Sequence, residues 1–324
     1  MSYRIGIDLG GTKVETILLD SENEVLFRHR IPTPPLQTGQ APETRYLEIV
    51  AAVCSLVREA ASQIPASTTA LEKISRTDAE PPKPGAIPAD VAVGIGIPGI
   101  LDRRTGRVIN ANTTCLIGHP LQQDLEAELG RPIAIENDAN CFTAAECVNG
   151  AARGKDFVFG VIMGTGCGGG LWANGRIRSG MHGIGGEWGH ISIDPQGRQC
   201  WCGNRGCIET MISGSGVEAG HKERTGQALP MRDIVAGFRA GDADCQATMQ
   251  AFFADFGRAL GGIISAIDPD LIVLGGGLSN IPELYTQGVA RVQDFAFHPG
   301  IQTPIVKNEL GDSAGVFGAA AIGI

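Results

Sequence analysis

The chain has 324 residues, with 26 Lys and Arg against 35 Asp and Glu, and its formal net charge is −9. This acidic balance argues against nucleic acid or an anionic membrane as the main partner, and no apolar run reaches the roughly 18 residues of a membrane-spanning helix. Glycine contributes 46 residues, about twice its usual share of roughly 7%. These glycines cluster after apolar runs, where phosphate-binding turns are expected.

The first part of the chain predicts a β-hairpin, a third strand and a helix. Apolar side chains alternate over residues 4–9, break at Gly10-Gly11 and resume over 14–19, which is typical of a hairpin with a glycine turn. A third strand is expected over 25–31, and 43–62 has apolar residues at helical spacing. The start lacks the features of a signal peptide, so we expect a cytoplasmic protein whose nine cysteines are reduced.

The middle of the chain alternates strands and helices after a proline-rich insert. Residues 66–90 lack apolar periodicity and predict an exposed insert. A buried strand over 91–97 ends at Pro98-Gly99. A short amphipathic helix over 121–129, a strand over 133–135 and a helix over 142–148 are expected to follow.

The second half repeats the opening theme. An apolar strand over 157–163 is broken by glycines from Gly164 onward, and a second apolar strand over 271–274 ends in Gly275 to Gly277. Helices are expected over 251–267 and 315–324. Because a strand, a turn of glycine and threonine, and a second strand recur after about half the chain, the sequence predicts two similar α/β domains.

The three glycine turns are candidates for phosphate and nucleotide binding, because glycine lets backbone N–H groups approach a phosphate closely. In the first turn, Asp8 could hold Mg²⁺ through water. Ordinary hairpin turns explain the first two patterns as well, and a strand-to-helix turn explains the third. The candidate residues are Asp8, Gly10, Gly11, Thr12 and Lys13; Gly164, Thr165 and Gly166; and Gly275, Gly276 and Gly277.

A carboxylate at Asp138 follows a strand and precedes a helix. At that place it could deprotonate a sugar hydroxyl that attacks a γ-phosphate, since a single Asp commonly serves as the base in phosphoryl transfer. The alternative is a helix N-cap.

One histidine and three cysteines form the most specific cluster. His190 precedes Cys200, Cys202 and Cys207, and glycines between the last two cysteines let the loop curl. A Cys₃His set suits four-coordinate structural Zn²⁺, whose site has no open position for catalysis. The alternative is a group of unrelated buried residues.

Taken together, these motifs resemble the ROK family of sugar kinases within the actin-like ATPase superfamily, and the block Glu187–His190 with Cys200–Glu209 is similar to the family signature. The resemblance implies an α/β fold with two RNase-H-like domains and an active-site cleft between them. We expect a smaller N-terminal domain over 1–118 plus 303–324, and a larger domain over 119–302 that carries the zinc loop. ATP with catalytic Mg²⁺, structural Zn²⁺, a sugar substrate and a homodimer are also implied.

The resemblance assigns roles residue by residue. Asp138 would be the catalytic base, and the glycine turns would flank the phosphates and the adenosine. His190 would bind zinc with one ring nitrogen and the sugar with the other. The residues implied to bind the sugar are Gly99, Asn112, Asn137, Asp138, Glu187, His190 and Glu209.

Within the family, residues 110–120 and 209–214 look most like bacterial fructokinases with mannokinase activity. We therefore expect phosphorylation of the 6-hydroxyl of D-fructose, with mannose as a further candidate substrate. The alternatives are an N-acetylglucosamine kinase or a glucokinase of the same family, because substrate choice depends on details of the pocket.

Two functions of other classes compete with the kinase. Some members of the family are sugar-sensing repressors, but the first strand begins near Arg4 and leaves no room for a DNA-binding module. An NAD-dependent oxidoreductase would need a helix directly after the first glycine turn, whereas a second strand is predicted there. Both are disfavoured.

Overall fold

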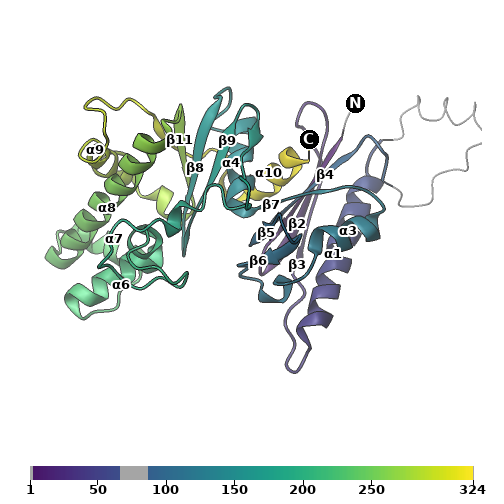
Figure 1. Ribbon diagram of the computed structural model, residues 1–324, viewed down its shortest axis with the longest axis horizontal. Helices are drawn as coiled ribbons and strands as arrows, with labels where there is room; N and C mark the ends of the chain where they lie inside the picture. Colours follow the sequence, from purple (N-terminus) through teal and green to yellow (C-terminus); the bar gives the residue numbers. More distant parts are fainter. Residues whose placement is uncertain (1–2, 66–86, 324) are drawn as a thin grey trace, which may run out of the picture. The chain divides into compact units, whose positions relative to one another are not determined.

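A computed structural model describes residues 3–65 and 87–323 of the chain (Figure 1). These residues form two compact units. Unit 1 comprises Met1–Ala145, Gly180–Gly183 and Asp312–Ile324, and unit 2 comprises Glu146–Ser179 and Ile184–Gly311. Most of the predicted insert, residues 66–86, lies outside the described part.

Unit 1 is built on a five-stranded sheet in the order β3-β2-β1-β4-β7. The first three strands are antiparallel, and β4 and β7 run parallel to β1. A separate two-stranded hairpin of β5 and β6 follows β4. The strands are β1 (Arg4–Leu9), β2 (Lys13–Leu19), β3 (Val25–Pro32), β4 (Ala92–Ile97), β5 (Ile100–Asp102), β6 (Arg107–Ile109) and β7 (Ala134–Asn137).

Two helices pack on this sheet, α1 (Pro42–Ser62) and α10 (Ala314–Ile322). Side chains alternate along β2, so Leu18 joins the core beneath α1 while Ile17 packs with α10. The strands under α10 carry glycine for a steric reason: a Cβ at Gly94 would lie 1.9 Å from the carbonyl oxygen of Ala319. The absence of that Cβ lets α10 approach β1 and β4 closely.

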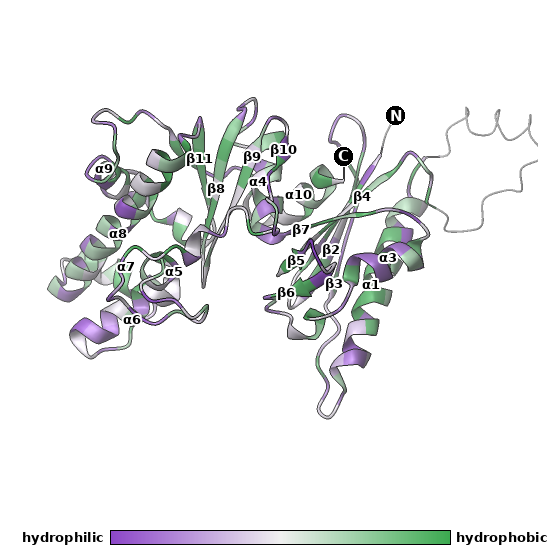
Figure 2. Ribbon diagram, viewed as in Figure 1, coloured by the Kyte–Doolittle hydropathy of each residue, from purple (hydrophilic) through white to green (hydrophobic). Residues whose placement is uncertain are grey.

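Unit 2 repeats the same strand pattern, in the order β10-β9-β8-β11-β12. β8 and β9 are antiparallel, and β11 and β12 run parallel to β8. Both β8 and β11 are mostly buried, and the hydrophobic colour along them in Figure 2 reflects this. The strands are β8 (Phe157–Met163), β9 (Cys167–Ala173), β10 (Arg176–Ile177), β11 (Leu271–Gly275) and β12 (Ile305–Lys307).

The longest helix described is α8 (Ala243–Ile267), which supplies buried phenylalanines to the core of unit 2. It begins earlier than the predicted residue 251, because Asp242 caps its N-terminus by accepting a 2.8 Å hydrogen bond from the Cys245 N–H. None of the helices described is long and apolar enough to cross a membrane. The remaining α-helices are α3 (Leu121–Leu129), α4 (Asp138–Asn149), α5 (Glu209–Ile212), α6 (Gly214–Thr225), α7 (Met231–Ala240) and α9 (Gln287–Val292).

The two units match the predicted repeat, but their limits differ from the predicted domains. Residues 119–145 belong to unit 1, because β7 pairs with β4 and completes the first sheet. Residues 303–311 belong to unit 2, because β12 pairs with β11. The first division therefore falls within α4 and not near residue 118.

Candidate active site and metal centre

In unit 1, the predicted phosphate turn joins β1 to β2. The Gly10 N–H donates to the Lys13 carbonyl oxygen across 2.9 Å and closes the turn. Thr33, directly after β3, stabilises the turn, because its hydroxyl donates to the Gly10 carbonyl oxygen at 2.7 Å. Gly11 and Thr12 are left exposed at the tip, so their backbone N–H groups are placed where an anion could reach them.

Asp8 is the last residue but one of β1 and interacts electrostatically with Asp138 at the start of α4. Burial, followed by the charge of Asp138, raises the pKa of Asp8 to about 6. Desolvation by the surrounding protein also raises the pKa of Asp138, although the residue is accessible to solvent, and backbone N–H groups such as that of Ala139 oppose this shift. Two carboxylates that disfavour each other's charge form a pair that a cation would stabilise.

The start of α4 resolves the alternative for Asp138. The helix cap is Asn137, whose Oδ1 accepts from the Asn140 N–H at 2.7 Å, three residues on. The Asp138 carboxylate accepts from the adjacent Ala139 N–H at 2.8 Å and from no N–H at the capping position three residues on in the described part of the helix. The capping interpretation therefore applies to Asn137, and the Asp138 side chain is exposed.

The remaining candidates in unit 1 lie next to each other at the end of β4. The Asn112 N–H donates to the Pro98 carbonyl oxygen at 3.0 Å. Gly99 is required there, since a Cβ would lie 2.7 Å from the Cβ of Ala111. Unit 1 thus contains the first glycine turn, Asp8, Gly99, Asn112, Asn137 and Asp138.

In unit 2, the second and third glycine turns lie together. The turn between β8 and β9 is closed by the Gly164 N–H, which donates to the Gly166 carbonyl oxygen at 2.9 Å. Gly276 has a φ of +80°, and a Cβ there would lie 2.4 Å from the Met163 carbonyl oxygen. Only glycine fits this close left-handed position, which places the third turn against the end of β8.

The start of α6 braces the second turn from the other side. The Gly214 N–H donates to the Gly164 carbonyl oxygen at 2.7 Å. The Ser215 hydroxyl donates to the Thr165 carbonyl oxygen, also at 2.7 Å. Sequence reasoning did not assign Ser215 a role, because a serine outside the predicted motifs carries no local signal of its partner.

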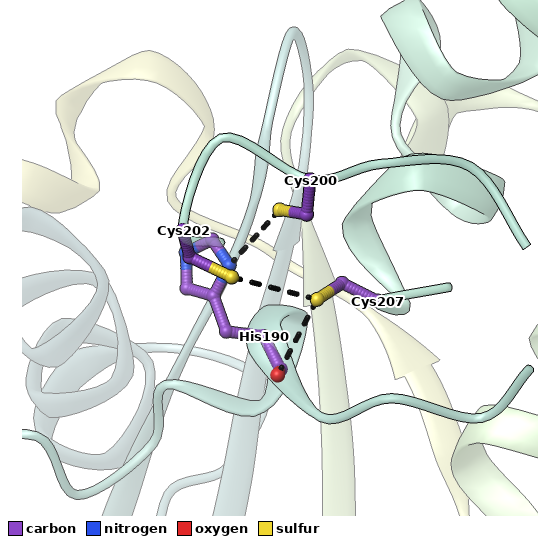
Figure 3. Close-up of side chains that lie close together, drawn as sticks. All are labelled: His190, Cys200, Cys202 and Cys207. Carbon is purple, nitrogen blue, oxygen red and sulfur yellow. Dashed lines mark hydrogen bonds between the residues drawn. The ribbon is translucent and has the colours of Figure 1, made fainter. Parts of the chain in front are cut away.

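The histidine and three cysteines converge as predicted (Figure 3). Their ligand atoms all lie within 4.8 Å of one another. His190 Nδ1 is 3.6 Å from Cys200 Sγ, and Cys202 Sγ is 3.6 Å from Cys207 Sγ. Tetrahedral zinc, with Zn–S of about 2.3 Å and Zn–N of about 2.0–2.1 Å, separates its ligands by about 3.4–3.8 Å. The cluster therefore fits Zn²⁺ in number and chemistry, and two of its ligand pairs already have tetrahedral spacing.

Arg198 ties the cysteine loop to the helices that follow it. Its guanidinium donates to the carbonyl oxygens of Thr210, at the start of α5, and of Gly216 in α6, the latter at 2.7 Å. The Gly206 N–H in turn donates to the Arg198 carbonyl oxygen at 2.8 Å. The loop is thereby fixed to α5, the helix that begins with Glu209.

Glu209 connects three parts of unit 2. Its Oε2 accepts from the Cys167 N–H at 3.0 Å, and its Oε1 accepts from the indole N–H of Trp201 at 2.8 Å. Trp201 also makes an edge-to-face contact with His190, with ring centroids 4.8 Å apart. Glu187 precedes the turn that carries His190 and is half-buried. Sequence reasoning missed both Cys167 and Trp201 as partners of Glu209.

The ROK family profile matches residues 78–324. N-acetyl-D-glucosamine kinase from Pectobacterium atrosepticum is 35% identical over 331 residues, covering 98% of this chain and 97% of the relative. The Haemophilus influenzae enzyme of the same name is 33% identical over 328 residues, covering 98% of both chains. The chain belongs to the ROK family.

Solved structures agree with this assignment. ROK hexokinase from Thermus thermophilus has a TM-score of 0.79 and 28% identity, covering 99% of this chain and 97% of that one. A ROK family glucokinase from Streptomyces griseus, in complex with glucose and AMPPNP, has a TM-score of 0.69 and 28% identity, covering 98% of each chain. The expected α/β architecture with two RNase-H-like domains of the actin-like ATPase type is confirmed.

Proposed function

We propose that this ROK protein is an ATP-dependent sugar kinase that phosphorylates the 6-hydroxyl of N-acetyl-D-glucosamine. The observation that carries the proposal is whole-length similarity to two proteins of that name. The chemistry of the site supports it, because phosphoryl transfer needs a base, fixed hydroxyl acceptors and an anion-binding backbone, and each has a candidate group in the structure.

Asp138 would accept the proton of the attacking hydroxyl. The residue is accessible to solvent at the start of α4, but the protein atoms packed around its carboxylate desolvate it partly and raise its pKa. A raised pKa makes a carboxylate a stronger base, provided that it is ionised at the working pH. Asn137 supports this role by capping the helix in place of Asp138.

Residues of unit 2 would orient the sugar. Glu209 is held through both carboxylate oxygens, and a carboxylate has lone pairs left over to accept from sugar hydroxyls. His190 directs Nδ1 toward Cys200, which leaves Nε2 for a hydroxyl. Glu187 completes this group, and Gly99, Asn112 and Asn137 of unit 1 would add contacts. The placement of the site between the two units remains a prediction of the family resemblance.

The glycine turns would bind ATP. Gly10, Gly11, Thr12 and Lys13 in unit 1, and Gly164, Thr165 and Gly166 in unit 2, would contact the phosphates, and Gly275 to Gly277 would flank the adenosine. Mg²⁺ bound with ATP would lie near Asp8, whose interaction with Asp138 would be relieved by a cation.

Structural Zn²⁺ would be held by His190, Cys200, Cys202 and Cys207. When bound, it would supply a rigid four-coordinate crosslink and no chemistry of its own. The loop itself would orient the His190 ring, and Arg198 fixes the loop to the helix that carries Glu209.

The choice of sugar differs from the expectation based on residues 110–120 and 209–214, which favours D-fructose. The two relatives reported above are named for the alternative substrate, and they match over nearly the whole chain. We therefore place N-acetyl-D-glucosamine first and fructose second. Cytoplasmic location and a homodimer remain predictions of the resemblance.

A coupled ADP-release assay tests the proposal. ATP with Mg²⁺ would be offered with N-acetylglucosamine, N-acetylmannosamine, glucose, mannose and fructose. We expect the highest kcat/KM with N-acetylglucosamine. A higher kcat/KM with fructose would make fructose the preferred substrate and leave the assignment of kinase activity intact. If none of the sugars is turned over, the assignment of kinase activity is wrong.

A further inference from the structure

Trp201 stands out among the three tryptophans of the chain. Its side chain is 67% exposed, whereas Trp188 is 2% exposed and Trp172 is half-buried in β9. An exposed indole contributes little to the hydrophobic core, so packing does not account for its place between two metal-binding cysteines. Trp201 instead contacts His190 and Glu209.

The contact with Glu209 is a directional hydrogen bond between side chains. The indole N–H, which can only donate, lies 2.8 Å from Oε1 of the carboxylate. The other oxygen is fixed by the Cys167 N–H at 3.0 Å. With only one of these two donors, the carboxylate could rotate about its terminal torsion, because such torsions are broad. With both, its plane is set.

We infer that Trp201 is a positioning residue for sugar binding: its indole N–H orients the Glu209 carboxylate, and its edge-to-face contact steadies the His190 imidazole. This inference rests on the proposed function, since Glu209 and His190 are the groups that would receive the sugar hydroxyls. Trp201 would act through Glu209 and His190, without contacting the metal or the reacting atoms itself. The cysteine loop thereby aligns two sugar-binding groups through one side chain.

The loop geometry explains how the indole reaches Glu209. Cys200 and Cys202 point to the common centre of the cluster (Figure 3), and Trp201 lies between them in sequence. The Cys200 N–H donates to the Asn204 carbonyl oxygen at 2.8 Å, and the Gly203 N–H donates to the Cys200 carbonyl oxygen at 3.1 Å. This tight turn fixes the backbone on both sides of Trp201, so the direction of the indole is set by the loop.

The test compares Trp201→Phe, which removes the N–H and keeps an aromatic ring, with Trp172→Phe, the same change in β9. Sugar affinity would be measured by calorimetry without nucleotide, together with KM for sugar, KM for ATP, kcat and bound zinc. We expect Trp201→Phe to weaken sugar binding and raise the sugar KM by about 3- to 10-fold, the effect of one partly exposed hydrogen bond. kcat, KM for ATP and zinc content should stay within about twofold.

Each other outcome contradicts a specific statement. Unchanged sugar affinity in Trp201→Phe, or equal weakening in Trp172→Phe, would overturn the positioning role. Loss of zinc in Trp201→Phe would show that the residue supports the loop itself. If the wild-type protein neither binds nor phosphorylates any of the five sugars, the proposed function fails. Normal wild-type turnover with an unaffected Trp201→Phe rejects only the inference about Trp201.

Discussion

The amide N–H of Cys167 donates to Oε2 of Glu209 across 3.0 Å, although the two residues are 42 positions apart in sequence. This bond joins the strand that follows the second glycine turn to the helix that follows the cysteine loop. In the proposed kinase, it would connect a group that binds phosphate to one that binds sugar. Both substrates would then depend on the same local geometry.

Gly166→Ala is expected to weaken sugar binding through this contact. A Cβ at Gly166 would lie 2.8 Å from Glu209 Oε2, so the carboxylate would have to move away from the Cys167 N–H. We expect the dissociation constant for sugar, measured without nucleotide, to rise by about 10-fold or more, as for the loss of a hydrogen bond to a charged group. Gly164→Ala is the control, because nothing lies within 4 Å of its Cβ position. Equal sugar affinities for the two variants would contradict the prediction.

Cys202→Ser is expected to remove the metal. The wild-type protein should carry about one Zn²⁺ per chain, and the variant well under half of that, because zinc binding in such sites is coupled to folding of the loop. The melting temperature should also fall by several degrees. Elemental analysis and a thermal scan measure both effects. Cys115→Ser makes the same change at a buried cysteine of unit 1, and it should keep its zinc; metal-free wild-type protein would refute the site.

Local patterns predicted the sheets well. The structure contains the strands predicted from alternation (β1 and β2) and from apolar runs (β4, β8 and β11). It also contains α1, which was predicted from helical spacing. The predicted helix began at residue 251, although residues 243–250 are half apolar; the signal that marks the true start of α8 is the cap at Asp242. The limits of the two units depend on which strand β7 and β12 pair with, and pairing between distant strands has no local signature.

The candidate site likewise combines features that a local sequence pattern predicts with contacts that no local pattern predicts. The cysteine spacing alone predicted the convergence of His190, Cys200, Cys202 and Cys207, because all four lie within one short stretch of chain. The contact between Cys167 and Glu209 could not be predicted, since a backbone N–H is present at every residue except proline and nothing in the sequence selects this one. For Asp138, the choice between base and cap needed the Asn137 geometry.

Asp138→Asn is expected to lower kcat by about 100- to 10,000-fold, the usual contribution of a general base, while sugar affinity changes by only a few-fold. The amide keeps the size of the side chain but cannot accept the hydroxyl proton. ADP release and equilibrium sugar binding measure the two quantities. Asp102→Asn, in the β5–β6 hairpin of unit 1, is the matched control. Wild-type turnover by Asp138→Asn would show that another group takes the proton.

Asp8→Asn is expected to stabilise the protein at neutral pH. Burial and the nearby Asp138 raise the pKa of Asp8 from its ordinary value of 3.8 to about 6, so the folded state binds the proton more tightly than the unfolded state. The ionised carboxylate therefore destabilises the fold; this penalty is fully present above pH 6 and is relieved as the pH falls toward 4. Two pKa units correspond to roughly 3 kcal/mol, and solvent screening reduces the expected gain to about 1–3 kcal/mol.

Urea unfolding without added Mg²⁺ measures this effect. The unfolding midpoint of Asp8→Asn should exceed that of the wild type at pH 7.5, and the difference should shrink steadily as the pH is lowered to 4.5. Glu22→Gln removes an exposed carboxylate from the turn between β2 and β3, and its midpoint should follow the wild type at both pH values. A difference for Asp8→Asn that does not change with pH would mean that ionisation of this carboxylate is not the cause. If Asp8→Asn is more stable than the wild type but has lost kinase activity, then Asp8 serves function and lowers the free energy of unfolding.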